Sequence, residues 1–356
     1  MIGDQALVVM CPHEFTLEHH HPLPPGHGEA LVRVHAVGIC GSDRELFHGT
    51  RPSEYVRYPV VPGHEWSGVV EAVGAAVPDD LVGRKVVGEG FRSCRRCDRC
   101  RAGETTLCAG GYEETGFTMP GAMAATLTLP ADLLHTLDDN ADLTAAALLE
   151  PAACAAAAAL QCRTQPGDRV AVVGTGTLGL LALQLLAASG PRELLAVGIH
   201  HDHAHTALGF GATHFRRHDE LAGPGEFDIV LEAAGGAGSA AAAVRLLRRG
   251  GRLVLTGIPA SNAIGLDPTD LVTRRIQVRT VFGAPPQAWS HAVRAFNAAI
   301  LDPLPLITHQ FALSEFRTAI DLVSAGDPAV GKVLLHPGRA ATTTGAAAAP
   351  AHRKRI

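Results

Sequence analysis

Four cysteines between residues 94 and 108 have the spacing of a metal site. They are Cys94, Cys97, Cys100 and Cys108, separated by two, two and seven residues. Four thiolates at such short spacings can surround a tetrahedral zinc ion and leave no coordination position open. A reducing compartment disfavours a disulfide pair, and the spacing before Cys108 differs from the ferredoxin pattern. The cluster therefore predicts a structural zinc that orders a loop and performs no chemistry.

A second group of metal-type ligands precedes this cluster. Cys40 is followed by Ser42 and Asp43, and His64, which lies 24 residues after Cys40, is followed by Glu65. Each part combines a zinc ligand with a carboxylate that could orient the ligand or occupy the site. Taken singly, a cysteine is more often a small buried hydrophobe, and one histidine among 19 is more often incidental.

A third ligand for this second site has two candidates. Glu150 lies within a stretch of Ala and Leu, where burial of a carboxylate is costly unless it is paired or bound to a metal. Cys154 follows four residues later and is the rival candidate. The residues alone leave both open.

A glycine motif indicates that the chain binds a dinucleotide. The motif consists of Gly174, Thr175, Gly176, Thr177, Leu178 and Gly179. This G-x-G-x-x-G pattern directly follows an apolar strand candidate and opens a leucine-rich helix candidate. Gly174 permits a tight turn, Gly176 lets the backbone approach a pyrophosphate, and Gly179 lets helix and strand pack closely. The helix N-terminus then faces the phosphates.

The end of the next predicted strand bears on the choice between NAD and NADP. About 20 residues after the motif an NAD site normally has an acidic residue, whereas this chain has Gly198. Without a carboxylate there, nothing repels a 2′-phosphate, which His200 or His201 could contact. The pattern leans toward NADP, although Asp202 could reach the ribose if the loop folds back.

Two regions of different character must position these residues. The chain is β-rich up to about residue 146, after which strands and helices alternate and predict a doubly wound parallel sheet. Strands are expected at 30–37, 67–73, 85–87, 169–173, 194–197, 227–231, 252–256, 276–282 and 331–335. Helices are expected at 177–189, 240–247, 289–300 and 314–324.

Composition and charge exclude several other classes of protein. The 356 residues are 47% hydrophobic and 18% charged, with a net charge of −5 at pH 7, which does not favour a nucleic-acid binder. No basic region followed by an apolar stretch opens the sequence, and the longest apolar run, about 152–160, is too short for a bilayer. We expect a soluble cytoplasmic protein with no nucleic-acid or membrane partner.

In this order, the motifs resemble those of the zinc-dependent medium-chain alcohol and polyol dehydrogenases, over roughly residues 25–336. The resemblance implies an α/β protein with a GroES-like β-rich catalytic domain and a Rossmann domain. The expected parts are a catalytic domain at 1–146 with a zinc lobe at about 90–110, a Rossmann domain at 147–284, a return to the catalytic domain at 285–338 and a disordered tail at 339–356.

The resemblance also implies two zinc ions per chain, one structural on the four-cysteine cluster and one catalytic. The catalytic ion is expected on Cys40 and His64, with Glu150 as the third protein ligand. In this arrangement a secondary alcohol bound at the zinc transfers hydride to the nicotinamide of NAD(P).

The resemblance assigns roles to the neighbouring residues as well. Glu65 is expected as a carboxylate close to the zinc, and Asp43 as a support for His64. Ser42 is placed to pass the hydroxyl proton outward. Glu45 stands where many alcohol dehydrogenases have a relay histidine, so that branch of proton transfer is not expected here.

Two short segments, 58–68 and 116–122, resemble the 2-deoxy-scyllo-inosamine dehydrogenases of aminoglycoside pathways. The expected substrate is a secondary alcohol of a cyclitol, aminosugar or polyol, with a role in antibiotic biosynthesis. Threonine-, sorbitol- and glucose-type dehydrogenases remain alternatives, as does a non-catalytic zinc-stabilised nucleotide-binding protein. A homodimer or homotetramer is expected, in which the strand at 276–282 pairs edge to edge.

Overall fold

The computed structural model describes residues 5–221, 225–259 and 262–339, and the chain divides into two units. The first unit comprises Met1–Cys97, Cys108–Glu150 and Pro303–Ile356. The second comprises Asp98–Leu107 and Pro151–Asp302. The expected tail at 339–356 lies, except for Arg339, outside the described residues.

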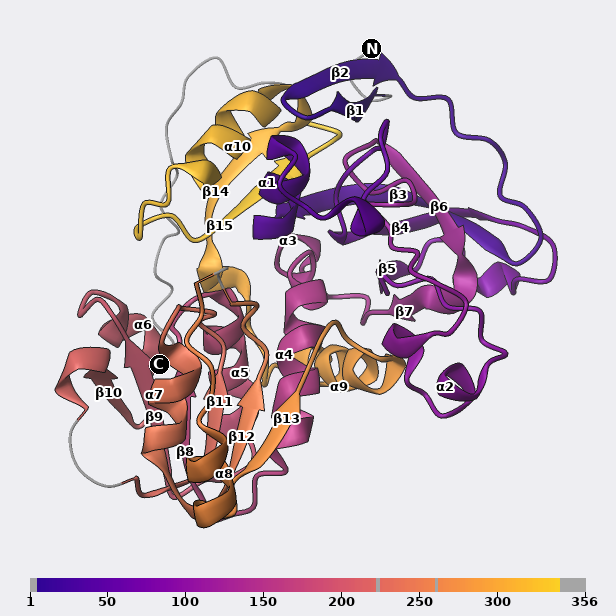
Figure 1. Cartoon of the computed structure of the whole chain (residues 1–356). Helices are drawn as coiled ribbons and strands as arrows, with labels where there is room; N and C mark the ends of the chain where they lie inside the picture. The colour runs from indigo at the N-terminus through magenta and orange to yellow at the C-terminus, as the bar shows by residue number, and fades with distance from the viewer. Residues whose placement is uncertain (1–4, 222–224, 260–261, 340–356) are drawn as a thin grey trace. The chain divides into compact units, whose positions relative to one another are not determined.

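The first unit is built on a mostly antiparallel seven-stranded sheet in the order β14-β15-β3-β4-β5-β7, with β6 beside β3, and a small β1-β2 sheet (Figure 1). Its strands are β1 (Gln5–Cys11), β2 (Glu14–His19), β3 (Glu29–Ile39), β4 (Glu65–Val73), β5 (Lys85–Gly88), β6 (Thr126–Pro130), β7 (Leu134–Thr136), β14 (Ile307–Ala312) and β15 (Lys332–His336). Its helices are α1 (Gly41–His48), α3 (Leu143–Ala146) and α10 (Phe316–Ser324).

Alternating side chains explain why β3 forms in the centre of this sheet. Val32 and Val34 are buried, whereas Arg33 between them is exposed, as the pleat of a strand requires. β15, from the end of the described chain, pairs with β3 through Val333 opposite Ile39. Residues from both ends of the sequence therefore share the core of the first unit.

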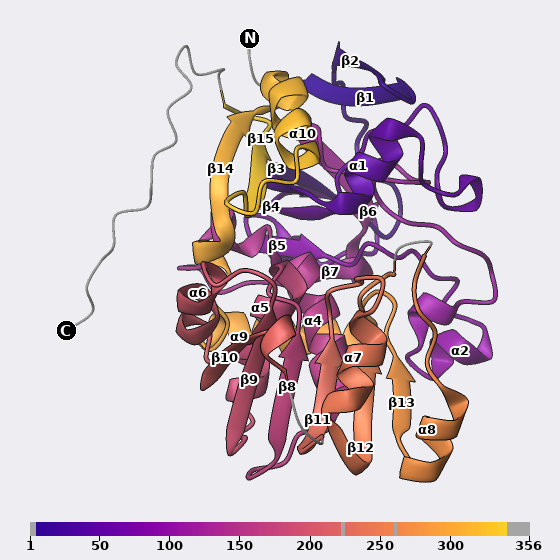
Figure 2. The ribbon, with the colours of Figure 1, turned by 60° about the vertical axis from the view of Figure 1, so that its left-hand side comes forward.

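The second unit is a parallel six-stranded sheet in the order β10-β9-β8-β11-β12-β13 (Figure 2). Its strands are β8 (Arg169–Val173), β9 (Glu193–Gly198), β10 (His214–Arg217), β11 (Phe227–Glu232), β12 (Leu247–Leu255) and β13 (Gln277–Thr280). Its helices are α2 (Asp98–Arg101), α5 (Thr177–Ala187), α6 (His203–Gly209), α7 (Ser239–Leu246), α8 (Pro268–Arg274) and α9 (Pro286–Asn297), while α4 (Leu149–Cys162) spans the boundary between the units. The predicted doubly wound sheet is confirmed.

Element boundaries differ from the expected ones at the later part of the chain. The return to the first unit begins at Pro303, and α9 belongs to the second unit, although the sequence suggested that the return starts at residue 285. The strand expected at 276–282 is shorter, because β13 covers only Gln277–Thr280. Among the described residues, no helix combines the length and the apolar character needed to cross a bilayer.

Candidate metal centre and dinucleotide loop

The four cysteines of the predicted lobe come together in the structure. The sulfur atoms of Cys94, Cys97, Cys100 and Cys108 all lie within 4.8 Å of one another. Cys108 Sγ accepts hydrogen bonds of 3.3 Å from the backbone N–H groups of Cys94 and Gly110. Backbone N–H groups also lower the pKa of the Cys94 thiol, which favours the thiolate. This donor set fits a tetrahedral zinc ion.

A second group of ligand atoms combines Cys40, His64 and Glu65, again within 4.8 Å of one another. The sheet explains why residues so far apart in sequence meet. Cys40 follows the end of β3 and Glu65 begins β4, and these adjacent antiparallel strands pair Gly38 with Glu65. His64, immediately before β4, is therefore carried next to Cys40.

The His64 imidazole is buried, and its orientation determines which nitrogen can bind a metal. Nδ1 lies 3.6 Å from Asp43 Oδ1, and neither atom has a hydrogen-bond partner within the described part of the chain. The other oxygen of Asp43 accepts a 2.8 Å hydrogen bond from the backbone N–H of Cys40. Because Nδ1 faces Asp43, Nε2 is the nitrogen left for a metal ion.

The electrostatics of this group favour a bound cation. Burial lowers the pKa of His64, but the Asp43 carboxylate and the Cys40 sulfur outweigh burial and hold that pKa well above its usual value. The group thus attracts positive charge at the position where a proton or a metal ion would sit. A sulfur and an imidazole in such a field suit zinc.

Lys332 is an ion-pair partner of Glu65 that the sequence analysis missed. Its Nζ donates to both carboxylate oxygens of Glu65, at 2.5 and 2.6 Å, and both side chains are buried. Burial lowers the pKa of Lys332, but Glu65 and Cys40 raise it above its usual value, so the ammonium stays charged. The only sequence signal was a lysine opening the apolar stretch of β15.

The two candidates for the third ligand are not resolved by this geometry. The groups of close ligand atoms found among the described residues include neither Glu150 nor Cys154. Glu150 is the second residue of α4, and its charge raises the pKa values of His64 and Lys332, so its carboxylate acts on the same group. Ser42 lies in the first turn of α1 and is half-buried.

A polar and aromatic cluster beside His64 was also missed by the sequence analysis. The ring centroid of Phe117 lies 4.8 Å from that of His64, and the Arg51 guanidinium lies 3.8 Å from the Phe117 centroid. The same guanidinium contacts Glu114 at 3.3 Å and the Tyr112 hydroxyl at 2.9 Å. Burial raises the pKa of Glu114 to about 7.

The glycine motif forms the turn between β8 and α5. A side chain at Gly179 would place its Cβ 1.9 Å from the carbonyl oxygen of Gly174, so only glycine allows the helix to approach the strand this closely. Gly176 is exposed and precedes the first residue of α5, as a backbone that meets a pyrophosphate should. Thr177 and Leu178 open α5 behind it.

At the end of β9, side chains crowd the position of Gly198. A Cβ there would lie 2.9 Å from the Phe215 ring and 3.0 Å from the Thr175 hydroxyl. His200 and His201 follow as exposed residues, and Nε2 of His201 lies 3.4 Å from a carboxylate oxygen of Glu220.

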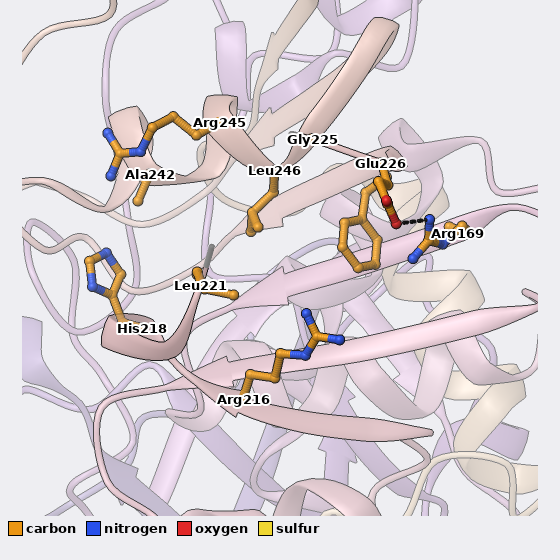
Figure 3. Close-up of a pocket in the computed structure, with 10 residues that line it drawn as sticks. Arg169, Arg216, His218, Leu221, Gly225, Glu226, Ala242, Arg245 and Leu246 are labelled. Atoms are coloured by element: carbon orange, nitrogen blue, oxygen red, sulfur yellow. Dashed lines mark hydrogen bonds and ion pairs between the residues drawn. The ribbon is translucent and has the colours of Figure 1, made fainter. Parts of the chain in front are cut away.

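A cavity of about 490 Å³ in the second unit contains none of the predicted site residues. It is lined by Arg169, Arg216, His218, Leu221, Gly225, Glu226, Phe227, Ala242, Arg245 and Leu246. Figure 3 shows the ion pair in its wall, where Arg169 donates to Glu226 at 2.5 Å. Arg169 begins β8, whereas the glycine motif follows the carboxyl end of that strand, which is where open parallel sheets bind ligands.

Comparison with known proteins identifies the family. Residues 26–139 match the alcohol dehydrogenase GroES-like domain, and residues 177–298 match the zinc-binding dehydrogenase domain. L-threonine 3-dehydrogenase of Deinococcus deserti is 30% identical over 322 residues, which cover 87% of this chain and 92% of that protein. The chain belongs to the zinc-dependent medium-chain alcohol and polyol dehydrogenases.

Other members of this dehydrogenase family match nearly the whole chain. Sorbitol dehydrogenase of Bacillus subtilis is 29% identical over 329 residues, covering 89% of this chain and 93% of that protein. The solved structure of a zinc-binding dehydrogenase from Sinorhizobium meliloti, bound to NADP, has a TM-score of 0.85 and 28% identity, with 94% and 99% of the two chains covered. The expected family, fold class and oxidoreductase activity are confirmed.

Proposed function

We propose that this dehydrogenase transfers hydride between a secondary alcohol of a cyclitol, aminosugar or polyol and NAD(P), at a zinc ion held by Cys40 and His64. The observation that carries this proposal is the buried group of Cys40, His64 and Glu65, whose ligand atoms lie within 4.8 Å of one another in a field that favours a cation.

Glu150 is proposed as the third ligand because Glu65 is already engaged. Both Glu65 oxygens contact Lys332, which would have to release the carboxylate before it could bind a metal. The Glu150 carboxylate is close enough to raise the pKa of His64. The second zinc per chain is proposed on the four cysteines, where it orders the lobe and takes no part in the reaction.

The residues of the chain have separate tasks in this proposal. Asp43 faces Nδ1 of the His64 imidazole, which leaves Nε2 for the metal position, and Ser42 accepts the proton of the substrate hydroxyl and passes it outward. Zinc, when bound, polarises the alcohol oxygen and lowers its pKa, as it lowers that of water from 15.7 to about 7. The nicotinamide supplies the hydride acceptor, and the glycine motif holds its pyrophosphate.

NADP is proposed as the preferred cofactor. Gly198 offers no carboxylate to bind the 2′-hydroxyl of NAD or to repel a 2′-phosphate, and the neighbouring Phe215 and Thr175 side chains crowd that position. His200 and His201 are exposed just beyond it and are proposed to contact the phosphate, for which His201 would exchange its contact with Glu220. The NADP-bound relative from Sinorhizobium meliloti supports this choice. We also propose a homo-oligomer assembled through β13, which is an edge strand of its sheet.

The substrate class rests on the two segments that resemble 2-deoxy-scyllo-inosamine dehydrogenases, which would place the reaction in antibiotic biosynthesis. The sorbitol and L-threonine relatives support a linear polyol or an amino-acid alcohol as a second candidate. All these substrates carry a secondary hydroxyl group, so the same apparatus would serve them.

A substrate panel with a metal-site control tests the proposal. Purified protein is assayed with an aminocyclitol, myo-inositol, sorbitol, glucose and L-threonine, each with NAD and NADP. We expect turnover of an aminocyclitol or polyol with NADP, and its loss in Cys40→Ser, which should still bind the cofactor. Unchanged turnover in Cys40→Ser refutes the zinc assignment, and turnover of L-threonine alone refutes the proposed substrate class.

A further inference from the structure

The contact that normally fixes a metal-binding histidine is unusually long at His64. Such histidines usually donate their second nitrogen to a carboxylate or carbonyl, and this bond sets the orientation of the ring. Here Nδ1 of His64 is 3.6 Å from Asp43 Oδ1, beyond hydrogen-bond distance, and both atoms lack a partner among the described residues. At this distance Asp43 attracts the imidazole but does not fix its ring plane, so a second contact can set the orientation.

Phe117 supplies that contact from the loop before β6. Its ring is 1% exposed, and its centroid lies 4.8 Å from that of His64 with the two planes tilted by 42°. A tilted aromatic pair at this distance is stabilising and directional. The position of the Phe117 ring thus determines how freely the imidazole can turn.

Arg51 in turn fixes Phe117. Its guanidinium carbon lies 3.8 Å from the Phe117 centroid, within the range of a cation–π contact. The planar guanidinium can stack on a ring while its N–H groups point outward to hydrogen-bond partners, which a lysine ammonium cannot do.

Three anchors keep the guanidinium over the ring. Arg51 Nε donates to the carbonyl oxygen of Tyr55 at 3.0 Å, and one terminal nitrogen donates to the Tyr112 hydroxyl at 2.9 Å and to Glu114 at 3.3 Å. Tyr112 also donates its hydroxyl to Glu114. The buried Glu114 carboxylate needs these donors, so the anchors support one another.

We propose that Arg51 is a positioning residue of the metal centre, because it clamps Phe117 against His64 and thereby sets the orientation of that ligand's ring. This inference rests on the proposed role of His64 as a zinc ligand. It assigns a task to Arg51, Tyr112 and Glu114, which none of the proposed catalytic steps uses.

Cobalt substitution tests the clamp separately from the reaction. Protein loaded with two Co²⁺ per chain should show absorption from the four-sulfur site and from the His64 site. In Arg51→Lys, which keeps the charge but loses the planar face, we expect the bands of the His64 site to shift and its Co²⁺ affinity to fall about tenfold. The four-sulfur bands should not change, which provides an internal control for folding.

Two further variants strengthen the test. Phe117→Leu should reproduce the change in spectrum and affinity, and the double variant should be no worse than either single one, because both substitutions break the same chain of contacts. Arg33→Lys, on the exposed part of β3, should behave as wild type. In turnover assays, kcat should fall more than KM rises.

The outcomes separate this inference from the proposed function. If wild-type protein binds a single Co²⁺, at the four-sulfur site, the proposed zinc centre at Cys40 and His64 is refuted, and so is the positioning role of Arg51. If wild type binds two but Arg51→Lys leaves the spectrum and affinity of the His64 site unchanged, the clamp alone is refuted. Additive losses in the double variant also refute it, because Arg51 and Phe117 would then act independently.

Discussion

Replacing Lys332 with methionine should lower the free energy of unfolding, because it leaves the buried Glu65 carboxylate unpaired. At 2.6 Å and an effective dielectric constant of about 20, the two charges attract by about 6 kcal/mol. Methionine has a similar length but no charge, so the variant leaves a fully buried carboxylate without its partner. Breaking a buried ion pair in this way typically costs about 3–5 kcal/mol of unfolding free energy. We expect the loss to be about 4 kcal/mol at pH 7, in the middle of this range.

Urea unfolding of zinc-loaded protein measures this loss in the first unit. Trp66 is buried in β4, next to Glu65, whereas Trp289 lies in α9 of the second unit, so a Trp289→Phe background makes Trp66 the reporter. Arg33→Met, which breaks the exposed pair with Glu71, should cost less than about 1 kcal/mol.

Two results would contradict this reasoning. One is an unchanged unfolding midpoint in the Lys332→Met variant at pH 7, which would mean that the ammonium does not compensate a buried charge. The other is an equal loss in a Lys332→Met/Glu65→Gln double variant, which would point to lost packing. We expect this double variant to recover most of the stability, because neither member of the pair is then charged.

Three other expectations concern the ligands, the cluster beside them and the dinucleotide loop. Glu150→Ala should lower zinc content from two ions per chain to one while Cys154→Ala keeps two, as measured by elemental analysis; the reverse result would make the cysteine the ligand. Burial raises the pKa of Glu114 in the folded protein to about 7, so its contribution to stability is present below about pH 4.5 and is lost as pH rises through 7. Melting temperatures of the wild type measured between pH 4.5 and 8 should therefore fall as pH rises, and Glu114→Gln should remove this decline. The same decline in Glu114→Gln as in the wild type would contradict this expectation. Gly179→Ala should weaken NADPH binding, followed by fluorescence, at least tenfold, because the added methyl group meets the Gly174 carbonyl.

Features encoded in short stretches of sequence could be predicted. The four cysteines lie within fifteen residues, and the glycine motif lies between adjacent elements, so spacing alone predicted that the members of each group come together. The alternation of strands and helices likewise predicted the parallel sheet. In these cases the residues that act together are neighbours in the chain, and chain geometry limits what they can do.

Contacts between distant residues could not be predicted in the same way. Lys332 and Glu65 are 267 residues apart, and Arg51 and Glu114 are 63 apart, so no spacing rule connects them. A lysine at the start of an apolar strand is usually a solvated end residue. The boundary near residue 285 was misplaced for a similar reason, since an amphipathic pattern predicts a helix but not the unit against which it packs.

The position of Lys332 in β15 has a consequence for the order in which the protein is made. Synthesis runs from the N-terminus, and early segments can begin to fold while later ones are still absent. When the ribosome has passed residue 302, every proposed metal ligand exists, but the ammonium that neutralises Glu65 does not. A nascent first unit that closed at that stage would bury Glu65 without its partner, so early closure costs free energy until β15 supplies Lys332.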